Sequence, residues 1–309
     1  MRVKILGSAA GGGFPQWNCA CPNCRALRAG TLQGKARTQA QVAVSEDGLL
    51  WFLLGASPDL LAQIEATPEL HPRRGMRHSP IAGVALVNAD LDHVLGLLLL
   101  RELQPLRIHA TASVRRILRE DNSMFGMLHR IPDQAAWTDF QSGKEFSLCD
   151  AQGQDSGLIC RALSLSTRYP SYVTAERQSQ LLPGEASLGF ILHSTSGARL
   201  AYMPAVPRVD DALLAELDAC DVLLFDGTFW SNTELMAVND DPRTGPTAQQ
   251  MGHMPVVETL IELAGLHRPR KIYIHINNTN PMLNEAGPEY RAVREAGWEI
   301  AEDGWQFDL

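Results

Sequence analysis

The chain has 309 residues, of which 45% are hydrophobic and 20% are charged, as is usual for a soluble globular protein. Its formal net charge is −8, from 27 basic and 35 acidic residues, and no Lys/Arg-rich stripe appears. This composition excludes a disordered, fibrous or disulfide-stapled protein and argues against nucleic acid and anionic membranes as partners. The longest apolar run, residues 94–100, is far shorter than the roughly 20 residues of a membrane span, and the N-terminal run is too short for a signal peptide. We therefore expect a cytoplasmic protein.

Strands and helices alternate along the chain, as the spacing of apolar residues and turn residues indicates. No repeat or low-complexity linker divides the sequence, so we expect a single domain over residues 1–309 with a layered α/β architecture. The last two predicted strands, 299–303 and 305–309, are expected to form a terminal hairpin. The other predicted strands are 3–6, 41–45, 49–54, 81–87, 107–110, 146–149, 158–165, 189–193, 199–203, 222–225 and 271–276, and the predicted helices are 58–66, 91–103, 113–119, 211–217, 256–264 and 288–296.

Three of the six cysteines, Cys19, Cys21 and Cys24, fall within six residues. In a reducing compartment such a cluster favours metal binding over disulfides, and zinc is the natural ion for converging thiolates. We predict a structural zinc loop at residues 14–30, whose fourth zinc ligand the sequence does not identify. The alternative is that the cysteines are free structural or redox thiols. The preceding glycine run, 11–13, matches neither a nucleotide-binding loop nor a dinucleotide fingerprint and predicts a tight loop.

Polar residues follow three of the predicted apolar strands, at the point where each strand ends. Ligands of α/β sheets collect at the carboxyl ends of strands, so these residues are expected to share one rim. Two imidazoles and two carboxylates suit a transition metal, although each residue alone also fits a helix cap or a buried structural role. It stays open whether Asp226, which follows strand 222–225, contacts the ion directly or only orients the other ligands. The four predicted ligands are Asp92, His93, Asp226 and His275.

The segment from Asn88 to His93 has the spacing of the H-x-H-x-D-H motif of the metallo-β-lactamase superfamily, with Asn88 and Asp90 in place of the two leading histidines. Together with stretches 6–13, 15–19, 36–39, 56–59, 225–228, 251–253 and 275–281, it makes almost the whole chain resemble one branch of that superfamily. This branch is the pyrroloquinoline quinone (PQQ) biosynthesis protein B family. The resemblance implies an α/β, metallo-β-lactamase-like αββα four-layer sandwich.

The resemblance also implies one retained metal position and one degraded position. Asp92, His93, Asp226 and His275 match the retained position, whereas the degraded position lacks its histidines, including one expected in loop 164–169. One ion held by two histidines and carboxylate is the ligand set of non-haem Fe(II) oxygenases. The family therefore implies an Fe(II)- and O₂-dependent hydroxylase in coenzyme PQQ biosynthesis, with zinc able to take the iron position on purification. Its substrate would be the tyrosine ring of a cross-linked Glu–Tyr dipeptide derived from a precursor peptide.

Several further residues are candidates for substrate binding and proton transfer. The substrate is rich in carboxylates, which guanidinium groups bind through two parallel hydrogen bonds. His253 is interpreted as a proton shuttle or as a residue supporting the metal ligands, with a structural role as the alternative. Segment 239–250 departs from the sequence expected of the family, which leaves the exact substrate open. The predicted substrate-binding residues are Arg37, Asn88, Asp90, Arg168, Arg243 and Asn277.

Two other functions stay open. A metal-dependent hydrolase or phosphodiesterase would need a second ion held by Asp90 and Asn88, so the number of bound ions distinguishes it from a hydroxylase. A non-catalytic carrier for the transport of PQQ or its precursor would bind its ligand without turnover. Other enzymes of the PQQ pathway and a second copy of the chain are the expected protein partners.

Overall fold

The computed structural model describes residues 1–238 and 245–309, and the chain divides into two compact units. The first unit comprises Met1–Leu6, Gln41–Arg199 and Gly304–Leu309, and the second comprises Gly7–Ala40 and Leu200–Asp303. Each unit is assembled from separate segments of the chain, and the single domain over residues 1–309 stays a prediction. Among the described residues, none of the helices has the length and apolarity needed to cross a bilayer.

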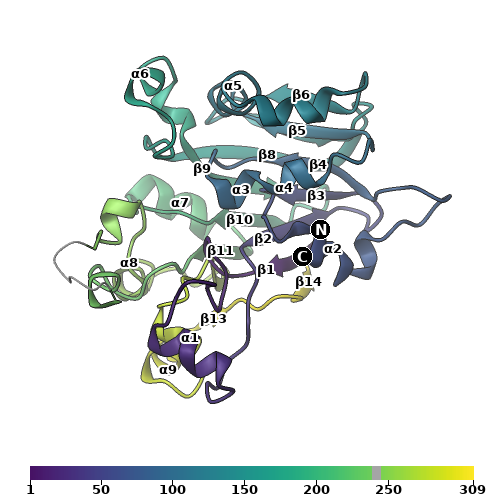
Figure 1. The fold of residues 1–309 in the computed structure, drawn as a ribbon. Coiled ribbons are helices and arrows are strands. Elements are labelled where there is room, and N and C mark those ends of the chain that lie inside the picture. Colours follow the sequence, from purple (N-terminus) through teal and green to yellow (C-terminus); the bar gives the residue numbers. More distant parts are fainter. Residues whose placement is uncertain (239–244) are drawn as a thin grey trace. The chain divides into compact units, whose positions relative to one another are not determined.

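The first unit contains a seven-stranded mixed sheet in the order β14-β1-β2-β3-β4-β5-β6 (Figure 1). β2 and β3 are antiparallel, whereas β3, β4, β5 and β6 run parallel to one another. Every residue of β2, β3 and β4 is buried, as expected for strands covered on both faces. The strands are β1 (Arg2–Gly7), β2 (Gln41–Ser45), β3 (Trp51–Leu54), β4 (Ile81–Ala85), β5 (Leu106–Ala110), β6 (Ala135–Asp139) and β14 (Gln306–Asp308).

Three more strands of the first unit form an antiparallel arrangement in which β8 pairs with both β7 and β9. They are β7 (Glu145–Cys149), β8 (Asp155–Ser166) and β9 (Ser187–His193). The helical segments are α2 (Leu60–Glu65), α3 (Leu91–Val94), α4 (Gly96–Leu99), α5 (Ala112–Arg119), α6 (Ala175–Gln178), η1 (Pro68–Leu70), η2 (Ser123–His129) and η3 (Pro183–Glu185).

The second unit is built on four parallel strands, paired in the order β10, β11, β12 and β13. Tyr273 of β12 stacks on Trp298 of β13 with ring centroids 4.1 Å apart, and both rings are buried. The strands are β10 (Arg199–Met203), β11 (Val222–Asp226), β12 (Arg270–Ile274) and β13 (Trp298–Ile300). The helical segments are α1 (Pro22–Arg28), α7 (Asp211–Asp218), α8 (Val256–Glu262), α9 (Pro288–Glu295), η4 (Met236–Val238), η5 (Gln249–Met251) and η6 (Pro281–Leu283).

Two predictions of secondary structure are wrong. The terminal hairpin does not form, because β13 pairs with β12 whereas β14 pairs with β1, with Arg2 opposite Asp308. The predicted helix 91–103 is replaced by the two short segments α3 and α4, and the chain leaves helical geometry before Leu103, whose φ is 63°. Helix α1 and strand β6 were not predicted, because the proline and cysteines around α1 suggested a loop and β6 is only partly buried.

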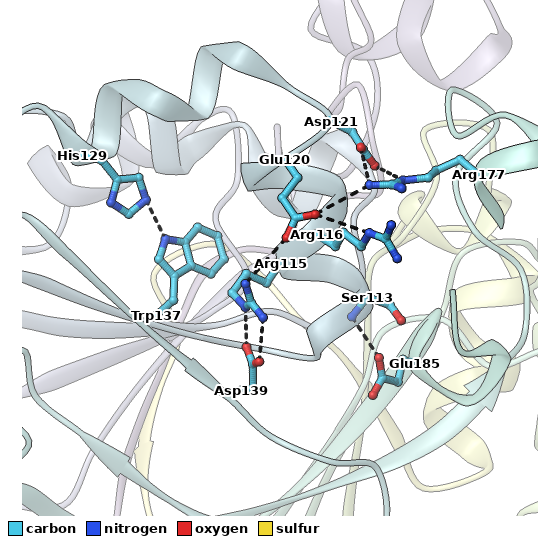
Figure 2. Close-up of polar contacts among 10 residues, drawn as sticks. All are labelled: Ser113, Arg115, Arg116, Glu120, Asp121, His129, Trp137, Asp139, Arg177 and Glu185. Atoms are coloured by element: carbon cyan, nitrogen blue, oxygen red, sulfur yellow. Dashed lines mark hydrogen bonds and ion pairs between the residues drawn. The ribbon is translucent and has the colours of Figure 1, made fainter. Parts of the chain in front are cut away.

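Polar contacts fasten α5 to its neighbours within the first unit (Figure 2). Thr111 caps the helix, since its Oγ1 accepts a hydrogen bond from the N–H of Val114 at 3.2 Å. The buried carboxylate of Glu185 accepts from the N–H of Ser113 in the first turn at 2.9 Å. Arg115 forms a two-point ion pair with Asp139 of β6 at 2.7 and 2.9 Å. Side chains from η3 and β6 thus fix the position of α5 within this unit.

Replacing Glu185 with Ala should lower the free energy of unfolding by about 1–3 kcal/mol, because it leaves a buried N–H of the first turn without its partner. Urea denaturation of both proteins measures the difference. Glu176→Ala, at an exposed position in the first turn of α6, is the matched control and should change stability by less than about 0.5 kcal/mol. Equal stability of Glu185→Ala and the parent would show that the contact does not support the helix.

Candidate functional site

The carboxylate of Asp226, at the end of β11, is fully buried and accepts four hydrogen bonds. Oδ1 accepts from the backbone N–H of Thr228 at 3.0 Å and from its hydroxyl at 2.7 Å. Oδ2 accepts from the N–H of Val206 at 2.8 Å and from Nδ1 of His253 at 2.8 Å. These four donors fix the plane of the carboxylate. A metal contact by Asp226 would have to share or displace one of them.

His275 lies directly after β12 in a left-handed conformation, with φ of 59°. This conformation is uncommon for residues other than glycine and is found mostly where surrounding contacts impose it. On either side of His275, the N–H of Ile276 donates to the carbonyl of Ser8 at 3.0 Å, and the N–H of Asn277 donates to the carbonyl of Thr228 at 3.0 Å. The backbone is therefore held in a strained form that directs the imidazole of His275.

Hydrogen bonds assign the tautomers of both imidazoles. The hydroxyl of Thr228 lies 2.8 Å from Nδ1 of His275, and its single hydrogen already serves an acceptor, either Asp226 or the carbonyl of His275. Because a carboxylate is the strongest of these acceptors, we assign the hydroxyl hydrogen to Asp226, so that Nδ1 of His275 donates and Nε2 carries the lone pair. Nδ1 of His253 faces the carboxylate of Asp226, so His253 has the same tautomer. The two rings stack with centroids 5.5 Å apart and planes 21° from parallel.

The structure brings together Asp226, His253 and His275, whose candidate ligand atoms all lie within 4.8 Å of one another. Both imidazoles keep Nε2 for a transition metal ion, and the contacts that Asp226 and Thr228 make through Nδ1 are those that orient metal-binding histidines. His253 was predicted only to support the site or to carry protons. Its place beside Asp226 and His275 makes it a third candidate ligand.

Asp92 and His93, the other two predicted ligands, lie in α3 of the first unit. His93 is buried, and its Nε2 is 4.0 Å from a carboxylate oxygen of Asp92. Gly55 lies against this histidine in a left-handed conformation, and a Cβ at Gly55 would come within 3.3 Å of Nδ1 of His93. The carbonyl of His93 also accepts from the N–H of Ala56 at 2.7 Å. Both residues are firmly held, and their joint site with Asp226 and His275 stays a prediction.

Asn88 and Asp90 occupy the positions of the leading histidines of the superfamily motif. The side-chain oxygen of Asn88 accepts from the N–H of Asp90 at 3.1 Å, and Asn88 is buried. The hydroxyl of Tyr172 donates to the carbonyl of Ala89, between these two residues. This segment is thus a structured turn in which the amide oxygen of Asn88 is already used.

The three clustered cysteines converge, with sulfur atoms all within 4.8 Å of one another. The side-chain nitrogen of Asn278 lies 3.1 Å from the sulfur of Cys19, 3.6 Å from that of Cys21 and 3.3 Å from that of Cys24. Burial raises the pKa of Cys21 to about 12. Burial also opposes ionisation of Cys19, but hydrogen bonds from Cys21, Asn278 and Cys24 outweigh it and lower the pKa of Cys19. Three converging sulfurs can supply three of the four ligands of a tetrahedral zinc ion.

Replacing Cys24 with Ser should remove about one equivalent of zinc per chain, because two thiolates cannot hold a structural ion as tightly as three. Elemental analysis of the purified proteins by inductively coupled plasma mass spectrometry measures the metal content. The control is Cys149→Ser, at a half-buried cysteine outside the cluster, which should keep the parent's zinc. Equal zinc in Cys24→Ser and the parent would exclude the cluster as a metal site.

The three arginines predicted to bind substrate lie in different surroundings. Arg37 is buried, and its guanidinium donates to the hydroxyl of Ser8 at 3.1 Å and to the carbonyl of Ala301. Arg168 is an exposed residue of the first unit. Arg243 lies outside the described residues. The substrate-binding roles of all three stay predictions, and the contacts of Arg37 favour a structural role for this residue.

One set of polar residues near His275 was missed by sequence reasoning. The side-chain nitrogen of Asn277 donates to the hydroxyl of Thr279 at 2.5 Å, and that hydroxyl donates to the carboxylate of Glu234. Glu234 also accepts from the N–H of Trp230 at 2.5 Å. Burial raises the pKa of Glu234 to about 7, against hydrogen bonds from Thr279 and Trp230 that lower it. Nothing in the sequence around Glu234 marks it, because its partner is 45 residues away.

The raised pKa of Glu234 predicts a pH-dependent effect on stability. A carboxyl whose pKa is higher in the folded state than in the unfolded state favours folding at low pH, and this contribution is lost as the pH rises from about 4.5 to about 7. Glu234→Gln removes this loss, so the variant should gain stability relative to the parent at pH 8 but not at pH 4.5. Thermal unfolding at both pH values measures the difference, and a gain that is equal at both would contradict the assignment.

Known proteins resemble this chain over its whole length. A family model described as "Beta-lactamase superfamily domain" matches residues 50–276. The chain is 41% identical to "Coenzyme PQQ synthesis protein B" of Methylobacterium sp. (strain 4-46) and 38% identical to the protein of that name in Methylorubrum extorquens (strain ATCC 14718 / DSM 1338 / JCM 2805 / NCIMB 9133 / AM1), in both cases over 100% of both chains.

Solved structures give the same result for the fold. The crystal structure of Zn(2+)-bound PqqB from Methylobacterium extorquens matches with a TM-score of 0.89 and 38% identity, covering 100% of both chains. A diphosphatase from the PhnP family matches with a TM-score of 0.67 at 18% identity, over 100% of this chain and 97% of that chain, which shows a shared fold only. The metallo-β-lactamase fold predicted from the sequence is confirmed.

Proposed function

The chain belongs to the coenzyme PQQ synthesis protein B family of the β-lactamase superfamily, and from this premise we propose that it hydroxylates the tyrosine ring of the cross-linked Glu–Tyr precursor of PQQ with Fe(II) and O₂. The observation that carries the proposal is the cluster of His253, His275 and the buried carboxylate of Asp226, in which Nδ1 of each imidazole is hydrogen-bonded and Nε2 is left for an ion. Histidine and carboxylate around one ion with open positions are typical of non-haem Fe(II) oxygenases. In this proposal Asp92, His93, Asp226 and His275 form the ligand set, and zinc replaces iron on purification.

The turn after β4 favours one ion over two. Hydrolases of this fold class that generate a hydroxide between two ions need imidazoles at the positions of Asn88 and Asp90. Here the amide oxygen of Asn88 accepts from the N–H of Asp90 and is committed to the turn. A second ion would therefore have Asp90 as its main ligand, which disfavours hydrolysis as the function.

The residues around His275 in the second unit have definable tasks in this reaction. Fe(II), when bound, supplies the redox chemistry that O₂ needs to react with an aromatic ring. Asp226 keeps a proton on Nδ1 of His253, so Nε2 of His253 is the atom that either binds metal or accepts the phenol proton of the substrate. Thr228 holds the imidazole of His275 in one orientation, and Asn277 follows it with its side-chain nitrogen engaged by Thr279.

Mass spectrometry of the cross-linked Glu–Tyr dipeptide tests the proposal directly. After incubation with the Fe(II)-loaded protein, O₂ and ascorbate as electron donor, we expect a mass gain of one or two oxygen atoms. The zinc-loaded protein and His275→Ala should give none. A dipeptide that binds but never gains oxygen would favour a carrier, and cleavage of phosphodiester substrates with two ions per site would favour a hydrolase.

His253→Gln distinguishes the tasks of the two histidines. A role in proton transfer predicts a rate lower by about 10²- to 10⁴-fold with iron still bound, whereas a role as ligand predicts loss of iron. His267→Gln, at an exposed histidine of the same unit, is the control and should match the parent. Full activity of His253→Gln would contradict both roles.

A further inference from the structure

A groove of about 820 Å³ in the second unit runs along the cysteine loop and the segment after His275. Its volume lies in the range of pockets that hold small ligands and dipeptides. Phe229 lines the groove and also contacts His253, with ring centroids 5.7 Å apart in an edge-to-face arrangement. Asn277, two residues after His275, lines it as well. The groove thus adjoins two of the candidate metal ligands.

The lining has two chemical characters. Leu235, Val238 and Met251 join Phe229 in an apolar part, which suits an aromatic ring. Asn18, Asn277 and Thr279 provide amide and hydroxyl groups. An amphiphilic ligand with an aromatic ring and polar substituents matches this lining.

Arg25 of α1 is the one charged residue among the described residues that line the groove. It is exposed, and no described residue forms an ion pair or side-chain hydrogen bond with its guanidinium. Arg28, on the same helix, differs in this respect, because it donates to the carbonyls of Cys19 at 2.6 Å and Gln16 at 2.5 Å and so fastens the cysteine loop. Arg28 is therefore engaged in the fold, while Arg25 is available to a ligand.

We propose that this groove is the substrate subsite and that Arg25 binds a carboxylate of the substrate, an inference that rests on the hydroxylase function proposed above. A substrate rich in carboxylates approaches a protein of net charge −8, so the guanidinium of Arg25, which no described residue pairs, supplies a local attraction in the groove that the whole molecule lacks. The planar guanidinium also matches a carboxylate through two parallel hydrogen bonds. The apolar part of the groove receives the aromatic ring next to the candidate metal ligands.

The test is binding of the cross-linked Glu–Tyr dipeptide to the zinc-loaded protein, which cannot turn it over, by isothermal titration calorimetry. Arg25→Gln should raise the Kd roughly 10-fold or more, as expected for loss of a charged hydrogen-bonded pair. Arg25→Lys should recover part of the affinity, because it keeps the charge but not the paired geometry. The control is Arg268→Gln, which removes an exposed ion pair with Asp221 elsewhere in the same unit and should bind like the parent.

Zinc content and oxygen insertion, measured on the same proteins, separate the outcomes. Equal Kd for Arg25→Gln and the parent overturns the inference, and so does loss of zinc from Arg25→Gln, because Arg25 would then support the cysteine loop. A parent protein that does not bind the dipeptide overturns both this inference and the hydroxylase. Binding that depends on Arg25, with unchanged zinc and no oxygen insertion by the iron form, supports the subsite and overturns the hydroxylase alone.

Discussion

The buried carboxylate of Asp226 is the constraint on which the second unit depends. A carboxylate without access to water is strongly destabilising unless its charge is met by donors. Its donors come from the loop after β10, from the turn after β11 and from the segment before α8, and Thr228 extends the network to His275 after β12. The carboxyl ends of β10, β11 and β12 must therefore lie in the right positions relative to one another for Asp226 and His275 to receive their hydrogen bonds. The hydrogen bonds that stabilise this part of the fold are therefore the same ones that orient the imidazoles.

This hydrogen-bond network also determines which atoms of the two histidines remain for chemistry. Because Asp226 and Thr228 take the Nδ1 side of His253 and His275, the Nε2 atoms are those left for a metal ion or a proton. The strained backbone at His275, with φ of 59°, fixes where its ring points. When the ligands are held in place in the absence of the ion, the type and spacing of their donor atoms determine which metal ion binds. Imidazole with carboxylate favours iron and zinc, whereas the three sulfurs of the cysteine loop favour zinc.

Much of this site could be predicted from the sequence, because strand ends in parallel sheets carry function. Asp226 and His275 were found as polar residues that end apolar strands, and the fold followed from the motif between Asn88 and His93. Long-range pairing could not be predicted. A strand of only three residues such as β14 does not indicate in its sequence that its partner is β1. Glu234 escaped notice for the same reason. The sequence also does not show whether an arginine is used inside the fold, as Arg37 is, or has no side-chain partner among the described residues, as is the case for Arg25.

Three consecutive residues after His275 connect features that look unrelated in the sequence. Asn277 lines the groove, Asn278 places its side-chain nitrogen against the three cysteine sulfurs, and Thr279 bonds the carboxylate of Glu234. Cys19 and Cys21 line the same groove, so an ion held by the cysteines would make that wall rigid. In the function proposed above the groove holds an aromatic ring at reacting distance and needs such a wall, because small displacements of a substrate cost large factors in rate. In that proposal the cysteine loop shapes the groove beside the reacting atoms without taking part in the chemistry.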